Sequence, residues 1–138
     1  MNETSPLHLA DGQDAVHLPS SPADAPAIIA VRAFGHNYDG YVEKYCTPAD
    51  VGRLVSFATS HESWRVWETH PGGDELVIVT RGQAEFVQRL GDREVAVMVG
   101  VGQAIVNPAG VPHTANVVEP FDAVYITAAP GTYHEPRA

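Results

Sequence analysis

Between about residues 28 and 129, the sequence is dominated by short runs in which apolar and polar side chains alternate. Alternation of this kind is typical of β-strands with one buried face. Residues that favour turns separate the runs, as in Gly72-Gly73, Gly91-Asp92 and Asn107-Pro108-Ala109-Gly110. Many short strands at regular spacing predict an all-β sandwich or barrel. The strand-like runs are Ile28–Ala33, Tyr41–Cys46, Ser63–His70, Glu75–Thr80, Ala84–Leu90, Glu94–Val99, Ala104–Val106 and Ala123–Ala128.

One short helix is expected near residues 48–59. Thr47 suits the N-cap and Pro48 suits the first helical position. An apolar face at helical spacing follows, made of Val51, Leu54, Val55 and Ala58. We expect this helix to close one end of a barrel or to join a subunit interface.

The chain of 138 residues is long enough for one domain with a core. Residues 1–27 are rich in proline and lack aromatic side chains, which predicts a flexible N-terminal arm. Alternatively, the alternating apolar residues from Leu7 to Leu18 allow the arm to lie as a strand along a subunit partner. The barrel is expected over residues 28–130, followed by a loose tail over 131–138.

Composition and charge exclude several classes of function. The net charge of −9 repels phosphate backbones, so nucleic acid is not an expected partner. The single cysteine, Cys46, excludes an internal disulfide and every Cys-x-x-Cys motif. It is expected to be buried and inert, the alternative being a reactive thiolate. No apolar run approaches the roughly 20 residues that span a bilayer, and no secretory signal is recognisable. We therefore expect a soluble, cytoplasmic protein with no membrane partner.

Residues that can bind a metal ion gather in two segments. Glu68 and His70 stand two apart, on the same face of a predicted strand. The following Pro-Gly-Gly turn folds the chain back, so that Glu75 can return close to His70. Asp74 can also reach this place, but it is expected to be a turn residue.

The second segment presents His113 after a turn built by Pro108, Gly110 and Pro112. Brought together, the two segments supply two imidazoles and one or two carboxylates, which is a common ligand set for Fe, Zn, Mn and Ni. Glu68 has an alternative as a partner of Arg65 or Arg81 across the sheet. Four further histidines are expected to be polar surface residues: His8, His17, His61 and His134.

The same two segments resemble the two motifs of the cupin superfamily, G-x5-H-x-H-x3,4-E-x6-G and G-x5-P-x-G-x2-H-x3-N. The matching residues are His70, Glu75 and Gly82 in the first motif and Gly102, Pro108, Gly110 and His113 in the second. Three positions depart from the pattern. Glu68 replaces the first histidine, Glu62 replaces the opening glycine, and the closing asparagine stands one residue early at Asn116.

The resemblance implies a small double-stranded β-helix, or jelly-roll, barrel that forms a homodimer. It implies that His70, Glu75 and His113 hold a divalent metal ion (Fe, Mn, Ni or Zn), with Glu68 as a fourth ligand or a general base. The implied function is a metal-dependent oxygenase, isomerase, epimerase or decarboxylase acting on a small polar metabolite. Two alternatives remain, a non-catalytic barrel that binds or senses a metal or small molecule, and a metal-free assembly barrel. Four aromatic residues are expected in the core or on the pocket wall: Trp64, Trp67, Phe86 and Tyr125.

Overall fold

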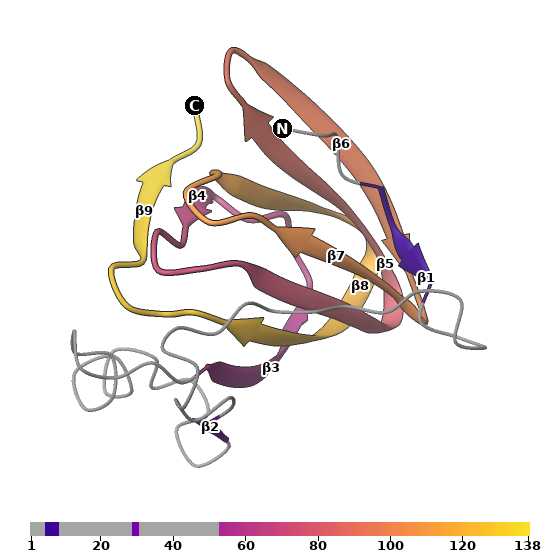
Figure 1. The fold of residues 1–138 in the computed structure, drawn as a ribbon. Helices are drawn as coiled ribbons and strands as arrows, with labels where there is room; N and C mark the ends of the chain where they lie inside the picture. The colour runs from indigo at the N-terminus through magenta and orange to yellow at the C-terminus, as the bar shows by residue number, and fades with distance from the viewer. Residues whose placement is uncertain (1–4, 9–28, 31–52) are drawn as a thin grey trace.

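The computed structural model describes residues 5–8, 29–30 and 53–138, and these residues form an all-β structure (Figure 1). No helix occurs in these ranges, and thus none that is long and apolar enough to cross a membrane. The strands are β1 (Leu7–His8), β2 (Ile29–Ala30), β3 (Leu54–Ser60), β4 (Val66–Thr69), β5 (Glu75–Leu90), β6 (Arg93–Gly100), β7 (Gln103–Asn107), β8 (His113–Thr127) and β9 (Tyr133–Pro136).

The two longest strands, β5 and β8, pair with each other and organise the fold. The strand order is β1-β7-β5-β8-β3-β2, with β6 beside β5, and with β4 between β8 and β9. Every pairing is antiparallel except that of β2 with β3. The first half of β5 pairs with β7 and its second half with β6, so the sheet curls around one interior (Figure 1). This arrangement is the jelly roll that the resemblance to the cupin motifs implies.

A bend in the middle of β5 and β8 allows this curling. The register between the two strands shifts repeatedly between Val79 and Ala84. Gly82 lies in the bend with φ +77°, and a Cβ atom there would come within 2.0 Å of the carbonyl oxygen of Pro120. Only glycine fits this close approach. The sequence pattern predicts two strands, Glu75–Thr80 and Ala84–Leu90, with a turn between them. The structure instead has one continuous strand, β5, with a bulge at this place.

The core lies inside the curled sheet and is formed by alternate residues of the central strands, as the period-two pattern predicts. Phe86 and Phe121 are fully buried and pack edge to face, with ring centroids 5.9 Å apart. Trp67 is also buried, beneath the guanidinium of Arg89 at 4.2 Å from its ring centroid. The main cluster consists of Val77, Val79, Ala84, Phe86, Val97, Val99, Ile105, Ala115, Phe121, Ala123 and Tyr125.

The prediction of a helix near residues 48–59 is wrong for the described part of this range, because the chain forms β3 from Leu54 onward. Leu54 to Ser60 pair with β8 at seven consecutive positions. Val55, Phe57 and Thr59 favour strands, and the backbone bonds to β8 outweigh the short helical pattern. Residues 48–52 lie outside the described residues, as do the strand expected at Tyr41–Cys46 and Cys46 itself.

The ends of the chain also differ from the expectation. Residues 131–138, expected to be a loose tail, contain β9, which pairs with β4. Two residues of the expected arm form β1, which pairs with β7. Strand β8 begins at His113, well before the run at Ala123–Ala128. Pro120 makes this segment look unlike a strand in the sequence, because proline interrupts a strand pattern. In the structure it lies opposite Gly82 at the bulge, where a strand tolerates proline.

Candidate metal centre

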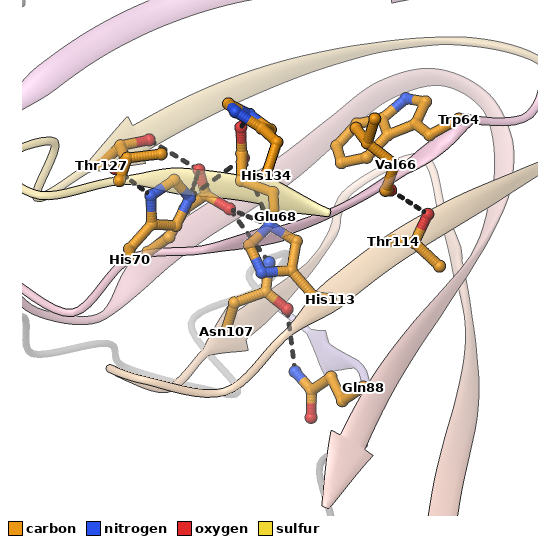
Figure 2. Close-up of polar contacts among 12 residues, drawn as sticks. Trp64, Val66, Glu68, His70, Gln88, Asn107, His113, Thr114, Thr127 and His134 are labelled. Atoms are coloured by element: carbon orange, nitrogen blue, oxygen red, sulfur yellow. Dashed lines mark hydrogen bonds and ion pairs between the residues drawn. The ribbon is translucent and has the colours of Figure 1, made fainter. Parts of the chain in front are cut away.

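Three neighbouring strands place the four candidate ligands at one end of the barrel interior. Glu68 lies in β4, and His70 directly follows that strand. Glu75 begins β5, after the turn at Gly72-Gly73, and His113 begins β8. Glu68 and His113 stand opposite each other in the pairing of β4 with β8. Figure 2 shows Glu68, His70 and His113 pointing toward one another.

The donor atoms of these four residues all lie within 4.8 Å of one another. His70 Nε2 is 3.0 Å from Glu68 Oε1 and 3.2 Å from Glu75 Oε2. His113 Nε2 is 3.4 Å from Glu68 Oε1 and 3.2 Å from Glu75 Oε1. Each imidazole nitrogen therefore faces both carboxylates, and the four groups surround a common point.

Two observations show that a metal ion fits this point. Among the described residues, neither buried nitrogen, His70 Nε2 or His113 Nε2, makes a hydrogen bond of good geometry, and each instead faces two carboxylates. In addition, donors about 2.1 Å from a metal ion lie roughly 3.0 Å apart at adjacent octahedral positions and roughly 3.4 Å apart in a tetrahedron. The observed nitrogen–oxygen distances fall in this range.

Hydrogen bonds from surrounding residues orient Glu75, which is 2% exposed. The hydroxyl of Thr127 donates to Glu75 Oε2 at 2.6 Å, and the amide of Asn107 donates to Oε1 at 3.0 Å. Asn107 in turn accepts a hydrogen bond of 2.9 Å from Gln88 Nε2 (Figure 2). Outer partners of this kind fix metal ligands in their binding orientation.

The two histidine rings are held differently. His70 Nδ1 lies 2.7 Å from the hydroxyl oxygen of Thr132, which turns Nε2 toward the donor cluster. His113 is fully buried, and its Nδ1 has no hydrogen-bond partner among the described residues. Its ring is fixed by packing against His70 at 5.2 Å and against the edge of Trp64 at 6.3 Å between centroids.

The four groups shift one another's pKa values strongly. Burial alone would lower the pKa of His70 and His113, but the adjacent carboxylates outweigh it and raise these values to about 10 and about 9. Burial would raise the pKa of Glu75, yet the two imidazoles hold it at about 2. Burial would also raise the pKa of Glu68, but its hydrogen bonds to His113, His134 and His70 keep that pKa well below its usual range. Without a metal ion, the cluster therefore pairs two imidazolium ions with two carboxylates.

A cavity of about 280 Å³ opens beside the cluster. Trp64 and Tyr125 stand on its wall, as the sequence analysis allowed, and Trp64 Nε1 donates to Ser60 Oγ at 3.2 Å. Burial and the nearby carboxylate of Glu75 raise the pKa of Tyr125, so this phenol stays protonated. The lining residues are Leu54, Ser56, Ala58, Ser60, Trp64, Glu68, His70, Glu75, Tyr125 and Thr127.

The structure brings together all four residues singled out as ligands, and it decides two of the alternatives. In the described part of the chain, Glu68 faces histidines, and Arg81 pairs with Asp122 at 2.8 Å. Asp74 is a turn residue, because its carboxylate accepts the backbone N–H of Ala109 at 2.8 Å.

Sequence reasoning missed two further residues at this site. His134, expected to be a polar surface residue, places Nε2 2.6 Å from Glu68 Oε2. Thr132 contacts His70. No local signal marks either residue, because both reach the site through the pairing of β9 with β4, which joins segments about half the chain apart.

No family model matches this chain, and no curated protein matches it. Among solved structures, it is similar to vicilin from Solanum lycopersicum (tomato), with TM-score 0.48 and 21% identity over 61% of this chain and 24% of that one. Vicilin from Capsicum annuum gives TM-score 0.49 and 21% identity over 61% and 25% of the two chains. An 11S globulin from Wrightia tinctoria gives TM-score 0.47 and 13% identity over 70% and 34%.

The matched region spans only about a quarter to a third of these longer chains. The likeness concerns the fold alone. What the site does must be argued from its own geometry.

Proposed function

We propose that this protein is a metal-binding jelly-roll barrel that holds one divalent ion through Glu68, His70, Glu75 and His113. The observation that carries the proposal is the convergence of four donors within 4.8 Å, two of them buried imidazole nitrogens that each face two carboxylates. Two imidazoles with two carboxylates suit Fe, Mn, Ni or Zn. When bound, the ion supplies a Lewis acid at the cavity wall.

The geometry best supports a non-catalytic role, in which the barrel binds or senses the metal ion together with a small polar molecule. Glu68 is held among three histidines and keeps a lowered pKa, which suits a ligand better than a general base. Apart from Glu68, His70 and Glu75, the described residues that line the cavity carry only hydroxyl, indole and apolar groups. The described wall of the cavity therefore offers no second carboxylate or imidazole for proton transfer.

A metal-dependent enzyme is the second candidate, and the cavity itself favours it. Its volume of about 280 Å³ lies directly beside the donors, so a small oxygen-rich metabolite could bind next to the ion. Ser56 and Ser60 would orient hydroxyl groups of such a molecule, and Trp64 would cover its apolar face. Glu68 would be the catalytic residue, released from the donor set to accept a proton. Oxygenation, isomerisation or epimerisation, and decarboxylation are the reaction types we propose for this case.

The decisive experiment is elemental analysis of protein purified without chelator or affinity tag. We expect one equivalent of metal in the wild type and in His61→Ala, whose histidine is exposed and lies outside the donor set. We expect little or none in His70→Ala and His113→Ala. Equal metal content in all four proteins would exclude the site. Lack of metal in the wild type, even after incubation with Fe, Mn, Ni and Zn, would favour a metal-free assembly barrel. Such a barrel is expected to form a homodimer, which light scattering can measure.

A second experiment separates binding from catalysis. Small oxygen-rich metabolites are offered to the metal-loaded wild type and to Glu68→Gln, under air and without it. Binding without turnover supports the non-catalytic role. Turnover by the wild type that is lost in a metal-loaded Glu68→Gln would assign catalysis to the enzyme candidate and the base role to Glu68. Loss of metal from Glu68→Gln assigns Glu68 as a ligand.

A further inference from the structure

The C-terminal segment crosses the outer side of the candidate metal centre. Strand β9 pairs with β4 at four positions, which include Glu68 opposite His134. Figure 1 shows β9 beside β4 at one side of the barrel, and β4 is its pairing partner among the described strands. All four residues of β9 are exposed. The strand therefore adds little to the core and is held through its pairing with β4.

His134 contacts one oxygen of Glu68, and the other oxygen faces the donor cluster. Its Nε2 lies 2.6 Å from Glu68 Oε2, the shortest polar contact of that carboxylate. The other oxygen, Oε1, faces His70 and His113 at 3.0 Å and 3.4 Å (Figure 2). Glu68 therefore presents a single oxygen to the donor cluster, because the second is already engaged from outside.

The same segment also supports a second ligand and is fastened at its far end. The hydroxyl of Thr132 lies 2.7 Å from His70 Nδ1. Beyond β9, the backbone N–H of Arg137 donates to the carbonyl of Arg65 at 3.0 Å. Its guanidinium donates to the carbonyl of Trp64 at 2.9 Å and to Asn116 Oδ1 at 2.8 Å. The segment is thus tied down on both sides of His134.

We propose that residues 132–137 form a strap that completes the metal centre, in which His134 is a positioning residue that keeps Glu68 a one-oxygen ligand. This inference rests on the proposed metal site. It accounts for the glutamate at the place where the cupin motif has a histidine. An imidazole offers one nitrogen from a stiff ring, whereas a carboxylate on a longer, more flexible stem can bind through one oxygen or two. His134 removes that freedom.

The consequence for metal binding follows from the exposure of Glu68. Its side chain is 21% exposed, the largest value among the four ligands, so without His134 it can rotate toward solvent or bind through both oxygens. Loss of an outer partner typically weakens metal binding about 10–100-fold. A change from one bound oxygen to two also changes the coordination number, which Co²⁺ reports in its visible absorption spectrum.

The test is a titration of the full chain with Co²⁺ alone, followed by visible absorption. The variants are His134→Ala, which removes the contact, His134→Gln, which keeps an N–H donor at similar reach, and Glu135→Ala. Glu135 is the matched control, because it is exposed on the same strand and lies outside the cluster. Circular dichroism checks that each variant is folded.

We expect His134→Ala to bind Co²⁺ about 10–100-fold more weakly and to change the shape or intensity of the absorption bands. His134→Gln should restore both properties largely to the wild-type level, and Glu135→Ala should leave them unchanged. Thr132→Val provides a second variant of the strap and should weaken binding through His70 even if His134→Ala does not fold.

Two results would overturn the inference, and they can be told apart. If the wild type binds Co²⁺ but His134→Ala and Thr132→Val match Glu135→Ala in affinity and spectrum, the strap has no part in the site, while the proposed metal centre stands. If the wild type binds no Co²⁺, both the proposed function and the inference are wrong.

Discussion

Metal binding should release protons, and the number released follows from the electrostatics of the cluster. In the metal-free protein, the pKa values of His70 and His113 are raised to about 10 and about 9, and that of Glu75 is lowered to about 2. Near neutral pH, both imidazoles are therefore protonated and both carboxylates are ionised. A histidine binds a metal ion only as the neutral imidazole. Uptake of one ion near pH 7 should release about two protons.

The pH dependence follows by linkage. The logarithm of the apparent association constant should rise by about two per pH unit near neutral pH and level off once pH passes the two raised pKa values. Calorimetric titration with Zn²⁺ in buffers of different ionisation enthalpy counts the protons directly. In His113→Ala, any residual binding should release about one proton fewer. Release close to zero at pH 7.5 in the wild type would mean that the histidines are already neutral, which refutes the ion-paired description of the empty cluster.

Three further predictions concern the surroundings of the site and the fold. Thr127→Val removes the 2.6 Å hydrogen bond to buried Glu75; it should lower the free energy of unfolding in urea by about 1.5–3 kcal/mol and weaken metal binding about 10–100-fold. Gly82→Ala should cost roughly 2–5 kcal/mol, because its Cβ would lie 2.0 Å from Pro120 O, whereas Gly91→Ala, with nothing within 4 Å of its Cβ, should cost only about 1–2 kcal/mol. Equal losses would contradict the close approach. In EDTA, the raised histidine pKa values stabilise the fold fully below pH 6.5 and lose this effect as pH rises through about 9 and 10. The lowered pKa of Glu75 stabilises it above pH 4.5 and loses this effect toward pH 2, so urea unfolding should find the metal-free protein most stable between pH 4.5 and 6.5.

The sequence predicts the central fold well because the signals there are local. Alternation along β5, β6 and β7 reports which side chains are buried, and glycines mark the turns between those strands. The spacing of His70, Glu75 and His113 predicts the donor cluster, since two short turns fix where those residues emerge. The structure confirms that these positions converge.

The rest depends on contacts between distant segments, which local patterns do not contain. Leu54–Ser60 reads as a helix until β8 is available as a partner for its backbone. Residues 113–119 of β8 pair with the second half of β5 across a bulge that the sequence presents as a turn. His134 looks like any exposed polar residue, and only its register opposite Glu68 brings it to the site.

The charge of the site links the unusual ligand at position 68 to the proposed role. The two negative charges of the carboxylates would balance the two positive charges of a divalent ion, and the imidazoles would be neutral, so the loaded centre would be neutral in a largely buried place. Neutrality lowers the cost of burying the ion. It also leaves less net positive charge to polarise a bound oxygen or to attract an anion than a set with a third histidine in place of Glu68. A glutamate at this position, with His134 beside it, therefore fits the non-catalytic role that we propose, in which the ion is held and does not activate a substrate.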